Sequence, residues 1–226
     1  MERYNIFQLI HKGLRAALYQ TALQLQQTDF TDTQETENAL NRVREIVMLF
    51  EGHAAKEDRY VFSAINAYEP SVVASFESEH EEDNFLGQQL RAYVEKLEQA
   101  PRLLEKIVLG GELTEAFTAF MAFNLRHMAK EEDIVNKILW RYYSDDEIKN
   151  INAQILQATP PWIQEFFMTW MLRGINDVEA VNWMKAIGKT RPEVVLQSIL
   201  QKAEQEWPVP RYRKIAGSLK EESVLA

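Results

Sequence analysis

The sequence predicts an all-α protein: an up-and-down four-helix bundle followed by a C-terminal helical extension. Along four long stretches of the first 143 residues, apolar residues recur at steps of three and four, the period of an amphipathic helix. Short segments containing polar residues, proline or glycine separate these stretches, which is typical of antiparallel neighbouring helices. All five tryptophans follow residue 139. We therefore expect two domains, a bundle at 1–143 and an extension at 144–226.

The first two predicted helices each place a histidine among inward apolar residues. The first runs from residue 2 to about residue 27, and His11 falls on its apolar stripe. A polar turn follows, with N-cap residues for the next helix, which runs from about residue 33 to 67. That second helix carries both His53 and Glu57 on its inward face, one turn apart.

The third and fourth predicted helices repeat this arrangement. A proline suited to a helix start opens the third helix, at residues 70–99, and His80 lies on its inward stripe. A connection ending at Gly110–Gly111 precedes the fourth helix, expected at residues 112–143. His127 lies on the inward stripe of that helix. Each of the four helices thus contributes one histidine to the predicted interior.

The extension contains no histidine and reads as a series of shorter helices. We expect these helices near residues 145–158, 161–172, 177–187, 192–206 and 208–220, with prolines and a glycine between them. Trp162, Phe166, Trp170 and Met171 form an apolar face too large to remain exposed in a monomer. We expect this face to pack on the bundle or to form a homodimer interface.

Composition and charge exclude several classes of function. The net charge is −9, and nearly all of the acidic excess lies before residue 144, which argues against the basic footprint of a nucleic-acid-binding protein. The absence of cysteine excludes disulfides, thiolate metal sites and thiol nucleophiles. The N-terminus does not resemble a signal peptide, and the longest apolar stretch is too short to span a bilayer. We therefore expect a cytoplasmic protein that binds neither nucleic acid nor membrane.

The four histidines and two glutamates predict one shared metal site. A single histidine on an apolar helix face often serves packing alone, and a single histidine–glutamate pair is a weak signal. Here, however, the bundle topology places all six side chains in one layer to within a few residues. His11, His80 and the two glutamates lie about 12–18 Å from one end, and His53 and His127 lie one turn deeper. Burying four imidazoles and two carboxylates without a cation would be costly. The predicted metal ligands are His11, His53, Glu57, His80, His127 and Glu131. Of the acidic residues around His80, we expect most to be solvated and at most one or two to face this site.

The spacing of these residues resembles the hemerythrin-like, or HHE cation-binding, domain. The resemblance rests on His11, His80 and the two stretches His53–Glu57 and His127–Glu131, and it covers about the first 143 residues. It implies a non-haem di-iron centre inside the bundle. In that family pattern the two glutamates would bridge the metals. His11 and His53 would bind one iron, and His80 and His127 the other.

The sequence departs from the oxygen-carrying members of that family at two positions. Asn84 stands where they have a fifth histidine, and Glu131 follows the last histidine by four residues, where they have an aspartate at five. Four histidines and two glutamates look more like the branch linked to nitric oxide and iron-centre repair. That branch often carries a cysteine-containing segment, and this chain has no cysteine.

Three functions therefore stay open. One is a di-iron protein that binds or senses a small diatomic ligand, dioxygen or nitric oxide. Another is an oxidoreductase that acts on nitric oxide or peroxide, or repairs iron centres, at the same centre. The third is a helical interaction protein whose metal is structural. Nitrogen and oxygen ligands also suit zinc or manganese.

Overall fold

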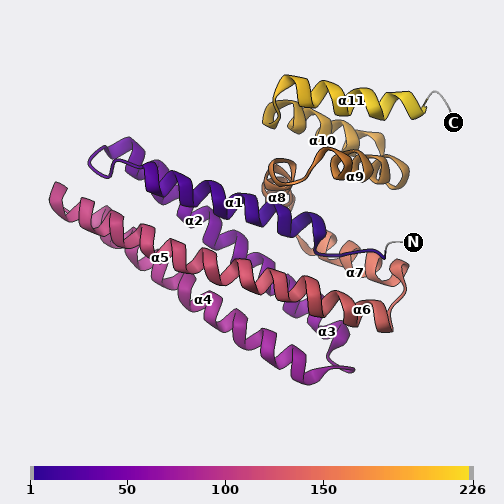
Figure 1. Cartoon of the computed structure of the whole chain (residues 1–226), viewed down its shortest axis with the longest axis horizontal. Helices are drawn as coiled ribbons and strands as arrows, with labels where there is room; N and C mark the ends of the chain where they lie inside the picture. Colours follow the sequence, from indigo (N-terminus) through magenta and orange to yellow (C-terminus); the bar gives the residue numbers. More distant parts are fainter. Residues whose placement is uncertain (1–2, 224–226) are drawn as a thin grey trace. The chain divides into compact units, whose positions relative to one another are not determined.

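The described part of the chain is helical in all its regular elements (Figure 1). The computed structural model describes residues 3–223. Two π-helical turns, η1 and η2, interrupt the α-helices. In chain order the elements are α1 (Gln8–Gln27), α2 (Thr33–Lys56), η1 (Glu57–Phe62), α3 (Ser63–Ile65), α4 (Pro70–Gln99), α5 (Leu103–Lys130), η2 (Glu131–Val135), α6 (Asn136–Tyr142), α7 (Asp145–Ala158), α8 (Pro161–Gly174), α9 (Asp177–Thr190), α10 (Glu193–Glu206) and α11 (Val209–Ser223). The predicted all-α class is confirmed.

The chain divides into two compact units. The first, called the bundle unit here, comprises Ala17–Ala158 and the segment that ends at Phe7; the second, the tail unit, comprises Gln8–Ala16 and the segment from Thr159 onward. Helix α1 therefore contributes residues to both units. The complete four-helix bundle and the domain boundary at residue 143 stay predictions.

Within the bundle unit, α4 packs along both α2 and α5. Arg44 and Glu51 on α2 pair with Glu98 and Arg91 on α4, respectively. Residue numbers thus rise along α2 as they fall along α4, so the two helices are antiparallel. The connection between α3 and α4 is short enough to require this reversal.

An apolar cluster packs beside the two π-helical turns. It draws its side chains from η1, η2 and the helices around them, and α7 closes it with the fully buried Ile148. Its buried members are Ile6, Phe7, Val61, Phe62, Ile65, Val73, Phe76, Val135, Ile138, Leu139 and Ile148. Burial of this apolar surface fixes the position of the residues that follow Glu57 and Glu131.

The expected start of the first helix is wrong, because α1 begins at Gln8 and residues 3–7 are not helical. The predicted start, Glu2, lies outside the described residues. The Arg3 guanidinium instead donates to the carbonyl oxygen of Trp140 (2.9 Å), and the Trp140 indole donates to the carbonyl oxygen of Tyr4 (2.8 Å). Helical periodicity did not reveal these distant partners.

The expected break at Gly110–Gly111 is also wrong, because α5 is continuous from Leu103 through both glycines. A Cβ atom added to Gly110 would lie 2.3 Å from the ring of Phe30, whereas one added to Gly111 would meet no atom within 4 Å. Gly110 therefore admits a close aromatic contact within a helix, while Gly111 has no such packing role.

The structure has helices at all five positions predicted for the extension, with boundaries shifted by a few residues. The first of them, α7, belongs to the bundle unit, and the other four belong to the tail unit. Its core is formed by Leu172, Ile175, Ala180, Met184, Ile199, Ala203, Trp207 and Ile215. The Trp207 indole donates to the carbonyl oxygen of Leu172 at 2.6 Å, which joins α8 to the end of α10. Trp170 is buried but Trp162 is 59% exposed. The homodimer interface stays a prediction.

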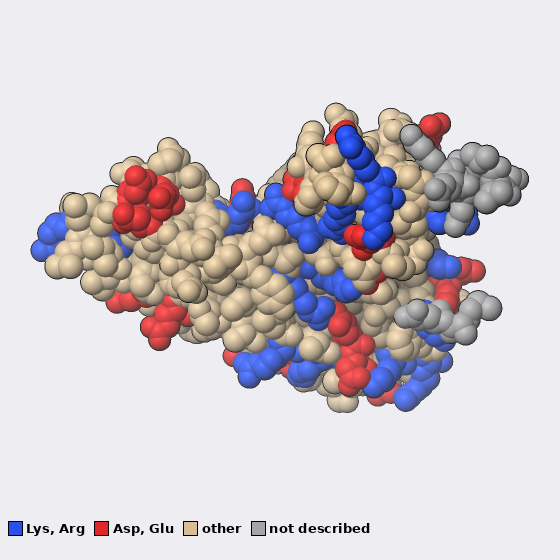
Figure 2. Space-filling view, turned by 45° about the horizontal axis from the view of Figure 1, so that its top comes forward, with Lys and Arg blue, Asp and Glu red and all other residues tan. Residues whose placement is uncertain are grey.

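No described helix combines the length and apolar character that crossing a membrane requires. On the face shown in Figure 2, groups of Lys and Arg alternate with groups of Asp and Glu.

The two neighbouring glycines of α5 allow a matched test of the packing. Gly110→Ala should lower the free energy of unfolding by about 1–3 kcal/mol, because the new methyl group overlaps the Phe30 ring. Gly111→Ala should raise it by about 0.5–1 kcal/mol, since alanine loses less backbone entropy in a helix. Urea unfolding of both variants measures the difference; equal effects would contradict the packing described for Gly110.

Candidate metal centre

Two histidine–glutamate pairs stand at the points where α2 and α5 end. His53 Nε2 lies 3.0 Å from Glu57 Oε1, and His127 Nε2 lies 3.3 Å from Glu131 Oε1. The relative exposure is 3% for Glu57 and 0% for Glu131. The expectation that each pair shares one inward helix face is therefore confirmed.

Both glutamates are also the first residues of π-helical turns. η1 begins at Glu57 and η2 begins at Glu131. Such wide turns are rare, and they occur often at functional sites, where they redirect side chains. These turns were not predicted, because an apolar stripe does not distinguish one wide turn from regular helix.

A third histidine meets the second pair from the neighbouring helix. The Nε2 atoms of His80 and His127 lie 3.1 Å apart, and His80 Nε2 lies 3.7 Å from Glu57 Oε2. Helices α4 and α5 are antiparallel here, since Asn124 contacts Asp83 whereas Lys130, further along α5, contacts Glu79. Nitrogen and oxygen donors of four residues, Glu57, His80, His127 and Glu131, thus converge on one place.

Two further carboxylates orient these imidazoles from outside. His80 Nδ1 is 2.7 Å from Asp58 Oδ1, and His127 Nδ1 is 2.9 Å from Glu79 Oε2. A carboxylate accepts a hydrogen bond, so each Nδ1–H donates and each Nε2 points to the interior. This arrangement is typical of metal-binding histidines. Glu79 belongs to the acidic run around His80, in which one or two residues were expected to face the site. Asp58, which lies next to Glu57, was not predicted.

The converging groups form a set able to hold one metal ion. Glu57, His80, His127 and Glu131 are all buried, and each offers a ligand atom within 4.8 Å of the others. Two carboxylates and two imidazoles suit iron, zinc or manganese. Carboxylates buried this deeply are stable only beside compensating positive charge. The donor set therefore fits a divalent metal ion.

In the metal-free protein, protons supply part of that positive charge. Burial lowers the pKa of His127, but its hydrogen bond with Glu131 and the nearby carboxylate charges outweigh burial and raise the pKa to about 9. Burial likewise lowers the pKa of His80, and the hydrogen bond with Asp58 reverses this and raises it. Burial raises the pKa of Glu79, but its bonds with Lys130 and His127 bring the pKa below its ordinary value.

The remaining predicted residues have distinct positions. His53 lines a small cavity beside His80 and His127. His11 is fully buried on α1 within the tail unit, and its part in the centre stays a prediction. Asn84 is exposed on α4, so the position that matches a fifth histidine faces away from the interior.

The acidic run around His80 divides as expected. Asp83 is buried and Glu79 is partly buried, whereas Glu77, Glu81 and Glu82 are exposed. Two members of the run therefore lie on the side of α4 that faces the centre.

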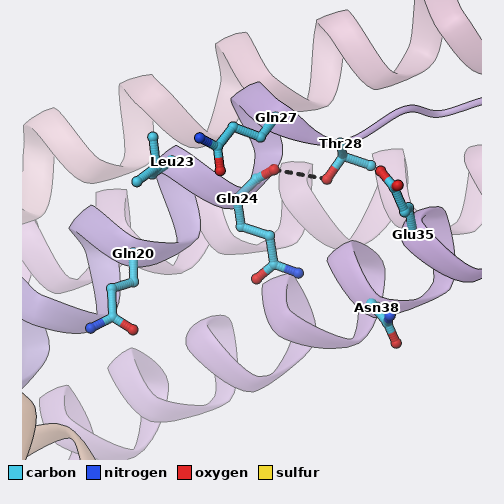
Figure 3. Close-up of a pocket in the computed structure, with 7 residues that line it drawn as sticks. All are labelled: Gln20, Leu23, Gln24, Gln27, Thr28, Glu35 and Asn38. Atoms are coloured by element: carbon cyan, nitrogen blue, oxygen red, sulfur yellow. Dashed lines mark hydrogen bonds between the residues drawn. The ribbon is translucent and has the colours of Figure 1, made fainter. Parts of the chain in front are cut away.

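The cavity beside the centre is small. It is lined by Phe50, His53, Ala54, Glu57, His80, Asp83, Asn124, His127 and Met128, with a volume of about 10 Å³. That volume is near the lower limit for one water molecule. A larger, open pocket of about 360 Å³ lies at the turn between α1 and α2 and contains none of the predicted ligands (Figure 3).

A family model described as the hemerythrin HHE cation binding domain matches residues 3–139. The F-box/LRR-repeat protein 5 of Mus musculus is 20% identical over 211 residues, covering 93% of this chain and 28% of the mouse protein. The protein of the same name from Xenopus laevis is 21% identical over 224 residues, covering 99% of this chain and 31% of its own length. The chain thus spans less than a third of these relatives. No solved structure matches the chain significantly.

Metal uptake should release protons and should tighten as pH rises toward about 9. The His127 pKa is raised from its ordinary value of 6.5 to about 9 in the metal-free fold, so a metal ion must displace a proton at pH 7. This raised pKa also stabilises the metal-free fold fully below pH 6.5, and the contribution is lost as pH rises through about 9. Calorimetric titration with metal in two buffers of different ionisation enthalpy measures the released protons. Uptake at pH 7 without proton release would contradict the protonated imidazole.

Proposed function

Because this chain belongs to the hemerythrin HHE cation-binding domain family, we propose that it is a non-haem di-iron protein that binds or senses a small diatomic ligand, dioxygen or nitric oxide. The observation that carries the proposal is the buried convergence of Glu57, Glu131, His80 and His127 beside a small cavity. Bound iron would supply open coordination positions and redox chemistry to such a ligand.

We propose six ligands drawn from four helices of an up-and-down bundle. Glu57 and Glu131 would bridge two ions, with His80 and His127 on one. His53 and His11 would complete the other, as the family pattern implies. The full burial of His11 and the unbroken course of α1 support its inclusion.

The residues around the proposed ligands have two tasks. Asp58 and Glu79 keep the Nδ1 protons of His80 and His127 in place, so that the Nε2 atoms remain available to metal. Phe50 and Met128 give the cavity an apolar side, which favours an uncharged diatomic molecule over water.

The proposed setting follows from charge and surface. We expect the protein in the cytoplasm, with neither nucleic acid nor membrane as a partner, because the net charge is −9 and no described helix crosses a membrane.

A homodimer through the extension is also proposed. It rests on exposed apolar side chains of the tail unit, among them Trp162 at 59% and Val194 at 72% exposure.

An interaction role with a structural metal is the second candidate, and the same exposed tail side chains favour it. An oxidoreductase acting on nitric oxide or peroxide, or repairing iron centres, would use the proposed di-iron centre itself. Gas titration of the reduced protein separates the first function from the interaction role. Turnover with an electron donor separates a ligand-binding protein from an oxidoreductase.

Iron reconstitution tests the proposal. We expect two iron ions per chain, near-ultraviolet charge-transfer bands in the oxidised form, and a spectral change when the reduced protein meets dioxygen or nitric oxide. Glu131→Ala should lose most of the metal, because it removes a ligand common to both ions. Glu81→Ala is the matched control, since Glu81 is an exposed glutamate on α4. Fewer than one metal per chain, or equal metal loss in both variants, would contradict the proposed centre.

A further inference from the structure

A polar pair lies one helical turn from the histidines of the centre. Asp83 follows His80 by three residues on α4, and Asn124 precedes His127 by three residues on α5. Because these helices are antiparallel, the two side chains meet in the next layer of the bundle unit. Asn124 Nδ2 donates to Asp83 Oδ1 at 2.5 Å, and the residues are 2% and 4% exposed, respectively.

The amide of Asn124 is held from a second direction. Its Nδ2 also donates to the carbonyl oxygen of Phe120, 3.2 Å away and one turn earlier on α5. Two acceptors on different helices therefore determine the orientation of the amide. The Oδ1 atom of Asp83 accepts the hydrogen bond from Asn124. The other carboxyl oxygen, Oδ2, can therefore turn toward another partner.

This pair lines the small cavity beside the centre. Apart from the proposed ligands His53, Glu57, His80 and His127, the cavity is lined by Phe50, Ala54, Met128, Asp83 and Asn124. The first three of these side chains are apolar. Asp83 and Asn124 are thus the lining residues that could hydrogen-bond a guest without being used as metal ligands.

We propose that Asp83 contacts the exogenous ligand in this cavity and that Asn124 positions it. The proposal rests on the proposed function, since it places the ligand at the iron centre. Burial raises the pKa of Asp83 more than the hydrogen bond from Asn124 lowers it. This direction favours the carboxyl form of Asp83, whose O–H can donate a hydrogen bond to a small ligand that carries an acceptor atom.

Azide binding to the oxidised, iron-loaded protein tests this role. Asp83→Leu should weaken azide roughly ten-fold or more, the factor that one hydrogen bond to a charged ligand contributes. Asp83→Asn retains both a donor and an acceptor and should bind within about three-fold of wild type. Glu81→Gln, on the exposed side of α4, should have no effect. Iron content and thermal unfolding of the chelated form verify that each variant folds and loads.

The infrared stretch of bound azide gives a readout that a purely structural role would not alter. In wild type it should shift between H₂O and D₂O, and in Asp83→Leu it should not. Asn124→Leu should weaken azide binding. The double variant Asp83→Leu/Asn124→Leu should bind azide almost as well as Asp83→Leu alone, because both residues act through one contact.

The outcomes separate two failures. If wild type binds azide and loaded Asp83→Leu binds it equally well, the assignment of Asp83 is overturned while the proposed function stands. If wild type with two irons binds neither azide nor nitric oxide, the proposed function and this assignment both fail.

Discussion

Charge burial at Glu57 and Glu131 is the constraint on which the rest of the bundle unit depends. These carboxylates are 3% and 0% exposed, so water does little to stabilise their negative charge. Positive charge must therefore come from within the protein interior. In the metal-free fold a proton on His127, whose pKa is raised to about 9, supplies part of it, and the pKa of His80 is raised as well. A metal ion would replace that proton, which joins metal binding to protonation and to folding.

The helices are arranged so that groups from several directions can compensate the negative charge of these carboxylates. π-helical turns begin at both glutamates, and antiparallel α4 presents His80 to His127 across the interior. Outside the imidazoles, Asp58 accepts from one ring. The apolar cluster beside the turns keeps the redirected backbone in place. Loss of any one donor would leave its neighbours as poorly compensated buried charges.

Much of this arrangement was predictable because it depends on periodicity. The spacing of His53 and Glu57 predicted a shared face, and the course of four amphipathic stretches predicted that histidines distant in sequence would meet. Asp58 and the π-helical turns were not predictable in this way. A carboxylate beside a ligand can face either side of a helix, and only the wide turn directs Asp58 toward His80.

Other differences arise from distant contacts that local rules do not contain. Two adjacent glycines usually favour a break, yet Gly110 lies inside α5 because the Phe30 ring occupies the space of its missing side chain. The segment around Arg3 follows a helical pattern but bonds instead to the end of the fourth predicted helix. In both places tertiary packing overrides intrinsic preference.

The central claim is that buried carboxylates and imidazoles gather around metal, and anomalous X-ray diffraction at the iron edge tests it most directly. Crystals of the iron-loaded protein should give two peaks per chain, both adjacent to Glu57 and Glu131, with one also touching His80 and His127. Peaks confined to surface carboxylates, or an ordered protein interior with no anomalous signal at that place, would contradict the account.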